Sequence, residues 1–469
     1  MTRAIHSTAT VLLFCAAIVS GAITSAAAAS EDATETPVNP SGSPLAGTDV
    51  DRIVAFGDVH GGADELQELL EALTLIDAAG DWSGGRTRLV SLGDLLDRGP
   101  DSRAVMDLLM KLEAQAAAAG GAVHLVLGNH ELMNLTGDLR YVSDEEYAAF
   151  ADDEDPNERA RALQRFQAEL QAAKPPKPQT HTRIAPKKEP EVDATAVFAE
   201  RFPPGYFAHR AAFAADGTYG SWLLSKPQIL ELDGIAFVHG GLSDTFSNRS
   251  IPDHNEQADE ELRALLAAGD RLVATGRLSP WQDYVTGTPA DGQALPPTFT
   301  SLRTSLQFDP TGPAWYRGTA GCHALIERPR FEAVLEERGL KRIVMGHTPT
   351  NPRIIQTRFE DRAVLADTGM YGSYYRGRPS AVIFSADEMR TLTLKSDGNL
   401  VEVRGRPAVD ARAESEQRWL EQIAATLEGL SLKPDRVIEF EANKRRLEAI
   451  WHKDSRKEQS ARLAAYALD

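Results

Sequence analysis

The chain has 469 residues, 42% of them hydrophobic, and its 68 acidic against 50 basic side chains give a formal net charge of −18. This length allows one large domain with appended segments. An acidic surface of this size argues against nucleic acid and against an anionic membrane as partners.

The first 29 residues have the pattern of a signal peptide. Arg3 precedes an apolar stretch, 11–23, that is too short to span a bilayer, and three small residues ending at Ala29 form a cleavage site. We therefore expect an exported protein, periplasmic or secreted, with no membrane anchor once this segment is removed. Residues 30–50 are rich in Thr, Pro, Ser and Gly, which predicts a disordered linker.

Three short apolar runs then alternate with two segments of helical periodicity. The runs 53–56, 89–92 and 123–127 have the length of buried strands, and apolar residues recur at helical spacing in 63–76 and 102–118. Right-handed crossovers in such a βαβαβ pattern bring the carboxyl ends of all three strands to one edge of a parallel sheet.

Each of these strands ends in a glycine followed by an acid or an amide. The three turns are Gly57-Asp58-Val59-His60-Gly61, Gly93-Asp94-Leu95-Leu96-Asp97-Arg98-Gly99 and Gly128-Asn129-His130-Glu131. Ligands gather at the carboxyl edge of a parallel sheet. The turns would bring Asp58, His60, Asp94 and Asn129 together there, and this set of carboxylate, amide and imidazole groups suits divalent metal ions.

The middle of the chain adds helices, an insertion and two further glycine turns. Residues 144–173, 253–268 and 331–338 are predicted to be helical, whereas 174–190, rich in lysine and with five prolines, is predicted to be an exposed loop. A strand over 229–238 leads to His239-Gly240-Gly241, and a short one over 343–345 leads to Gly346-His347-Thr348.

The last part of the chain has strand composition followed by a charged tail. Turn residues separate several strands, which suggests an antiparallel sheet that faces the first one; the strands are 353–357, 363–367, 381–384, 391–394 and 400–403. The main domain therefore covers 51–405, and 406–469 is predicted to be a helical tail without assigned chemistry.

The five glycine-flanked motifs, each preceded by a strand, resemble those of the calcineurin-like metallophosphoesterases, in the phosphoprotein phosphatase branch. Further motifs are similar to those of the bacterial Shewanella-like protein phosphatases: Met133-Asn134, Gly137-Asp138, Arg140-Tyr141-Val142, His239-Gly240-Gly241-Leu242 and Gly312-Pro313-Ala314-Trp315-Tyr316-Arg317. The resemblance covers roughly residues 51–405. It implies an α/β fold of two facing mixed β-sheets, a β-sandwich flanked by helices, with a dimetal site at the carboxyl ends of the strands.

The resemblance also implies which side chains hold the two metal ions. One ion would be bound by Asp58, His60 and Asp94, and the other by Asp94, Asn129, His239 and His347. Asp94 would bridge the ions, and the hydroxide between them would attack phosphorus. The ions are divalent or trivalent, Mn, Fe or Zn, with Mn the expected activator in vitro; these ligand types do not choose among them.

Four further residues are expected to act on the phosphate ester. His130 would be the general acid and Asp97 would orient its ring, although Asp97 could instead cap a turn. Arg98 and Arg317 would hold the phosphate oxygens, with a surface salt bridge as the alternative for Arg317. The predicted function is an exported phosphoprotein phosphatase acting on phosphoproteins or phosphopeptides, with phosphotyrosine favoured over phosphoserine and phosphothreonine.

Two other functions stay open at this point. A dinucleoside-polyphosphate hydrolase, or another small-molecule phosphoesterase of the same superfamily, would share most motifs but generally carries Gln in place of His60. A metal-binding interaction domain without activity is opposed by the presence of all six ligands and the acid. Cys322-His323 lacks the arginine spacing of a cysteine phosphatase, so we do not expect a cysteine nucleophile.

Overall fold

The computed structural model describes residues 34–37, 52–172, 193–246, 249–289, 292–385 and 388–404. The predicted signal peptide, the Pro/Lys-rich insertion and the helical tail lie outside these residues, so their predictions stay untested. Among the helices of the described residues, none has the length and apolar character needed to cross a membrane.

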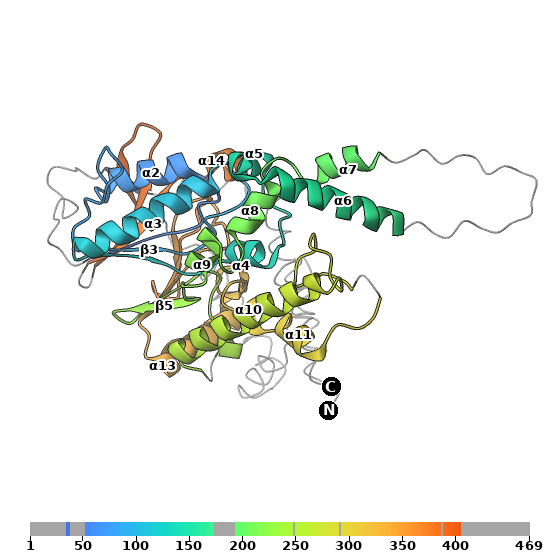
Figure 1. The fold of residues 1–469 in the computed structure, drawn as a ribbon. Helices are drawn as coiled ribbons and strands as arrows, with labels where there is room; N and C mark the ends of the chain where they lie inside the picture. Colours follow the sequence, from blue (N-terminus) through green and yellow to red (C-terminus); the bar gives the residue numbers. More distant parts are fainter. Residues whose placement is uncertain are drawn as a thin grey trace, which may run out of the picture.

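Two mixed β-sheets form the centre of the described part of the chain (Figure 1). The first has the strand order β1-β12-β11-β10-β2-β3-β4 and the second β5-β6-β7-β9-β8. The first sheet consists of β1 (Thr34–Pro37), β2 (Arg52–Phe56), β3 (Arg88–Ser91), β4 (Ala122–Leu125), β10 (Ser380–Ser385), β11 (Glu388–Leu394) and β12 (Leu400–Arg404). The second consists of β5 (Ile229–Leu232), β6 (Ile235–Val238), β7 (Arg342–Met345), β8 (Gln356–Arg358) and β9 (Ala363–Leu365).

Strand β2 shows why the apolar runs are continuous. Ile53 and Ala55 pack in the cluster between the two sheets, whereas Val54 and Phe56 pack in the cluster of the helix-covered outer face. Because both faces of the strand are buried, the residues that point to either face are apolar. Helices α2 (Ala63–Ala72) and α3 (Ser102–Ala118) contribute to the outer cluster. The second sheet is covered by α13 (Ala324–Arg338), which gives four layers, and the predicted fold class is confirmed.

In each sheet, the parallel strands bring their carboxyl ends to one edge. Strands β2, β3 and β4 are parallel, and so are β6, β7 and β9. The predicted βαβαβ unit is therefore confirmed, and α3 has the predicted bounds.

The strand predictions for the second half needed two corrections. The predicted single strand 229–238 is a β5–β6 hairpin, because Asp233 and Gly234 both adopt positive φ and make a tight turn. The strands after His347 do not form one sheet facing the first. Strands β8 and β9 join the second sheet, while β10, β11 and β12 extend the first through β2. Apolar alternation alone does not say which sheet a strand joins.

The prediction of a disordered linker is wrong for four of its residues. Thr34–Pro37 forms β1, which pairs antiparallel with β12. Without β1, the backbone of β12 would be a free sheet edge, and threonine has a high strand propensity.

The predicted helix 144–173 is divided into α5 (Asp144–Ala148), a 3₁₀ turn and α6 (Pro156–Ala172). Pro156 fits at the first position of a helix but not in its interior. An aromatic cluster joins α5 and α6 to α7 (Ala194–Arg201) and α8 (Tyr206–Ala212) on the side seen at the right of Figure 1. The predicted helix 253–268 is longer, α10 (Ile251–Ala274). Further helices are α4 (Asn129–Thr136), α9 (Thr218–Leu223), α11 (Pro297–Leu302), α12 (Gly318–Gly321) and α14 (Gly372–Tyr375).

Candidate metal centre

The carboxyl ends of five strands deliver the predicted metal-binding residues to one place. Strands β2, β3 and β4 lead to turns of the first sheet, and β6 and β7 to turns of the second. All six side chains are at most 5% exposed: Asp58, His60, Asp94, Asn129, His239 and His347. The sequence prediction that these residues come from separate loops of a common site therefore agrees with their positions.

Asp94 lies at the centre of two groups of potential metal ligands. Ligand atoms of His60, Asp94 and His130 lie within 4.8 Å of one another, and so do those of Asp94, His239 and His347. The Oδ2 atom of Asp94 is 3.8 Å from His60 Nε2 and 3.2 Å from His239 Nε2. One carboxylate is thus shared by two groups, which is the arrangement a dimetal site requires.

Three imidazoles each turn one nitrogen toward the centre and tie the other to a carbonyl. Nδ1 of His60 donates to Leu96 O at 2.8 Å, and Nδ1 of His239 donates to Leu92 O at 2.7 Å. His347 is reversed, because its Nε2 faces Trp315 O at 3.2 Å. These bonds fix the orientation of each ring, so that the nitrogen facing the centre has no backbone partner and can serve as a metal ligand.

The second group of donors fits a cation closely. His239 Nε2 lies 3.1 Å from both Asn129 Oδ1 and His347 Nδ1. Burial lowers the pKa of His239, but the charge of Asp94 outweighs it and raises that pKa to about 9, so without a metal ion the His239 ring carries a proton at Nε2. A metal ion can replace this proton, and the imidazole, amide and carboxylate groups gathered here are ligand types that such an ion accepts.

The electrostatics of the centre follow from its burial. Burial holds the pKa of His60 and of His347 well below the ordinary value, which favours the neutral imidazole that a metal ion binds. Burial alone would raise the pKa of Asp94, but His239 and His130 outweigh it and hold that pKa well below its usual range. The shared carboxylate is therefore ionised.

The Glu131 carboxylate and the close approach of the second and third turns to each other fix the backbone around the site. Glu131 accepts bonds from the backbone N–H groups of Gly128, Asp94 and Leu95 at 2.8 to 2.9 Å. It thus joins the second and third turns. A Cβ on Gly128 would lie 2.3 Å from Asp94 Oδ1, so only glycine fits there.

Five of the predicted site residues have positive φ: His60, Asp94, Asp97, Arg98 and His347. Such conformations are uncommon for residues other than glycine, although Asp and His tolerate them better than most. Their concentration in one site indicates that the surrounding bonds impose the local backbone.

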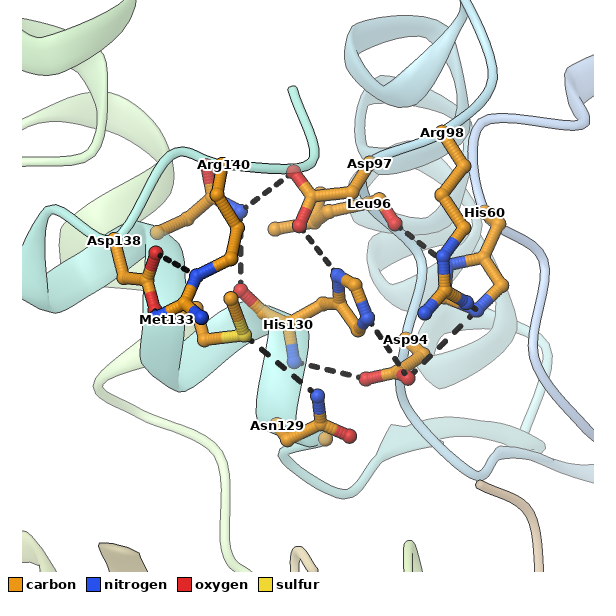
Figure 2. Close-up of polar contacts among 12 residues, drawn as sticks. His60, Asp94, Leu96, Asp97, Arg98, Asn129, His130, Met133, Asp138 and Arg140 are labelled. Carbon is orange, nitrogen blue, oxygen red and sulfur yellow. Dashed lines mark hydrogen bonds and ion pairs between the residues drawn. The ribbon is translucent and has the colours of Figure 1, made fainter. Parts of the chain in front are cut away.

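His130 is oriented by a carboxylate. Its Nδ1 donates to Asp97 Oδ2, and its Nε2 is directed at Asp94 Oδ2, 3.8 Å away (Figure 2). Asn134, one helical turn further along α4, donates to Asp97 Oδ1 at 3.0 Å. Asp97 is therefore a partner of the ring, and it is fully buried.

Two arginines stand beside the metal ligands. Arg98 and Arg317 line one pocket together with Asp94, Asn129, His130 and His347. Arg317 donates to His347 O at 2.7 Å and to Thr348 Oγ1 at 3.1 Å, so a loop next to the site holds it. Arg98 contacts His60 Nε2, a position from which its guanidinium can meet an anion at the centre.

Sequence reasoning missed two sets of site residues. Tyr374 and Tyr375 line the pocket from α14, a helix too short to show periodicity. Asp367 is buried two residues after β9 and had a local signal: like the other motifs it follows an apolar strand, although Ala366 rather than glycine precedes it.

The comparison with known proteins agrees with this geometry. Residues 51–181 match the family described as calcineurin-like phosphoesterase. Over these residues the chain is similar to this family. It is a metallophosphoesterase related to the Shewanella-like protein phosphatases, and its buried His and Asp groups fit the dimetal site of the family.

Three proteins illustrate the relationship. Shewanella-like protein phosphatase 2 of Arabidopsis thaliana is 28% identical over 341 residues, which cover 72% of this chain and 76% of the relative. A symmetrical bis(5'-nucleosyl)-tetraphosphatase of Edwardsiella ictaluri is 41% identical over 77 residues, 16% of this chain and 23% of the relative. The crystal structure of a cold-active protein-tyrosine phosphatase of a psychrophilic Shewanella species has a TM-score of 0.49 and 23% identity, covering 76% of this chain and 81% of that one.

Proposed function

We propose that the chain is an exported phosphoprotein phosphatase that hydrolyses phosphate monoesters with two bound metal ions and prefers phosphotyrosine. The observation that carries the proposal is the shared Asp94 carboxylate between two groups of buried ligands, with two arginines beside it. The relatives named as Shewanella-like protein phosphatases support a phosphoprotein as the substrate.

The residues around the centre have distinct roles in this proposal. Two metal ions bound by the six predicted ligands would supply Lewis acidity to the phosphate oxygens and to the attacking water. Arg98 and Arg317 would hold the remaining phosphate oxygens through charge-assisted hydrogen bonds. His130 would give a proton from Nε2 to the leaving oxygen, while Asp97 holds its Nδ1–H and stabilises the charged ring.

The preference for phosphotyrosine is supported by an aromatic rim around Arg98. The guanidinium carbon of Arg98 lies 5.3 Å from the ring centroid of Tyr141, 5.7 Å from that of Tyr374 and 5.3 Å from that of Tyr375. Tyr141 and Tyr374 are 42% and 59% exposed, unusual values for large apolar rings. A phenyl ring attached to a phosphate held by Arg98 would meet these rings, whereas a serine side chain would not reach them.

A phosphopeptide panel tests both the reaction and the preference. Purified protein with Mn²⁺ is given one peptide sequence carrying phosphotyrosine, phosphoserine or phosphothreonine, with diadenosine tetraphosphate as a further substrate. We expect the highest kcat/KM on phosphotyrosine. Higher activity on phosphothreonine would reverse the preference, and cleavage of the dinucleotide alone would replace the protein phosphatase by the alternative hydrolase.

The aromatic rim has its own test. Replacing Tyr374 with Ala should raise KM for the phosphotyrosine peptide about threefold to tenfold, since aromatic pairs contribute about 0.5–1.5 kcal/mol. The phosphoserine peptide is the control and should be unaffected. An equal change for both peptides would remove Tyr374 from substrate selection.

Export is tested separately from catalysis. The full-length chain is expressed in a bacterial host, the extracytoplasmic fraction is collected, and the amino terminus of the protein is sequenced. Cleavage after Ala29 should give a mature chain that begins at Ser30. An uncleaved protein in the cytoplasmic fraction would contradict export.

A further inference from the structure

Asp367 is a buried carboxylate that the proposed mechanism does not use. It is 1% exposed and follows β9, which is parallel to β7, so it emerges at the same edge of the second sheet as His347. Its backbone packs against the turn that carries Asp58. A Cβ on Gly57 would lie 2.4 Å from Ala366 O and 2.9 Å from Asp367 Cα, and only glycine allows this approach.

The two oxygens of Asp367 have different surroundings. Oδ1 accepts a bond from Gly369 N at 2.8 Å, a local turn contact. Oδ2 is buried and has no hydrogen-bond partner among the described residues. A buried ionic oxygen without a hydrogen-bond partner is destabilising, so the turn contact does not account for the whole side chain.

The group that faces Asp367 is another carboxylate. Its side chain lies within hydrogen-bonding reach of Asp58, which is itself a predicted metal ligand. Arg353 and Asp94 also act on Asp367 through their charges, but no Lys or Arg of the described residues forms an ion pair with it.

A cation or a shared proton between two such carboxylates would remove their repulsion. Oδ2 of Asp58 is 3.8 Å from His60 Nε2, so the pair adjoins the first group of ligands. We infer that Asp367 is an additional metal-binding side chain, which together with Asp58 and His60 holds the ion on that side of Asp94. This inference rests on the metal centre of the proposed function.

The substitution Asp367→Asn separates a cation from a proton. The amide oxygen keeps the bond from Gly369 N, and the amide nitrogen replaces the unpartnered oxygen as a donor toward Asp58. If a shared proton were the native partner, Asn would imitate the protonated acid and metal binding would not change. If the partner is a metal ion, Asn should weaken binding of one ion about 10- to 100-fold.

The experiment measures Mn²⁺ binding to the full-length apoprotein by calorimetry, and metal content by elemental analysis after dialysis. Asp361→Asn is the matched control, because it removes the same charge from an exposed position at the other end of β9. We expect two Mn²⁺ ions in the wild type and the control, and one weakened site in Asp367→Asn. Circular dichroism verifies that each variant is folded. Asp367→Ser, whose hydroxyl can also accept the bond from Gly369 N, must show the same loss of Mn²⁺ affinity at one site.

The possible outcomes separate this inference from the function on which it rests. Equal Mn²⁺ affinity in the wild type, Asp367→Asn and Asp367→Ser would overturn the role of Asp367 and leave the dimetal phosphatase intact. A wild-type protein that binds no Mn²⁺, Zn²⁺ or Fe²⁺ would overturn both. Equal weakening in Asp361→Asn would attribute the loss to net charge and also contradict the inference.

Discussion

Replacing His130 with Asn tests whether this ring is an acid or a metal ligand. The distances leave both roles open, because His130 Nε2 and His60 Nε2 each lie 3.8 Å from Asp94 Oδ2. The distinction comes from the other nitrogen. Nδ1 of His60 faces a carbonyl, whereas Nδ1 of His130 faces the buried Asp97 carboxylate, which stabilises a charged ring that can donate a proton.

The size of the effect follows from the role of a general acid. Proton transfer by a positioned side chain contributes about 10²- to 10⁴-fold, or about 3–5 kcal/mol of barrier. We expect this loss of kcat in His130→Asn for a tyrosine phosphate, whose leaving group needs a proton. The loss should be much smaller for para-nitrophenyl phosphate, whose leaving group departs readily as an anion.

The assay combines kcat on both substrates with metal content by elemental analysis. Two retained ions with a loss that depends on the leaving group would assign His130 as the acid. Loss of one ion would make it a ligand, and an equal loss of kcat on both substrates with metals retained would refute proton donation.

Three further predictions test the surroundings of the centre. Asp94→Asn should deplete both metal ions, and full metal loading by elemental analysis would contradict the bridging position. Glu131→Gln should lower the free energy of unfolding in urea by about 2–4 kcal/mol, because the group that accepts three buried N–H bonds loses its charge. A change within experimental error would show that the turns do not need the Glu131 carboxylate. Burial lowers the pKa of His254 to about 4. Below about pH 6.5, the ordinary pKa of histidine, the unfolded chain therefore binds a proton that the folded chain does not bind. The free energy of unfolding should fall as the pH drops from about 6.5 toward 4. His254→Gln should flatten this part of the stability curve measured by denaturation, and an unchanged slope would refute the assignment.

The first sheet and its turns were predictable because their signals are local. Continuous apolar runs specify strands buried on both faces, and the glycine turns that follow them are fixed by close approach, as at Gly128. Helix α3 was predicted at its observed bounds because its apolar residues have a clear helical spacing.

The missed features depend on contacts between distant parts of the chain. The periodicity of a strand does not show which sheet the strand joins. The packing of whole sheets decides that β10 pairs with β2 instead of facing it. Tyr141 and Tyr374, which belongs to α14, both lie next to Arg98 although they are far apart in sequence. Asp233-Gly234 and Asp367 are different, since both had a local signal: a tight-turn dipeptide and an acid at a strand end.

The position of the centre couples metal binding to the packing of the two sheets. His347 N of the second sheet donates to Asp58 Oδ1 of the first at 2.9 Å, and Nδ1 of His239 donates across to Leu92 O. The same edge gathers the buried carboxylates of Asp58, Asp94 and Asp367, whose like charges repel one another. Metal ions that bind the folded site and not the unfolded chain would therefore stabilise the sandwich at the edge where its two sheets meet, by RT ln(1 + [metal]/Kd) for each ion. Since Asp94 belongs to both groups of ligands, the two ions should stabilise the fold together rather than independently.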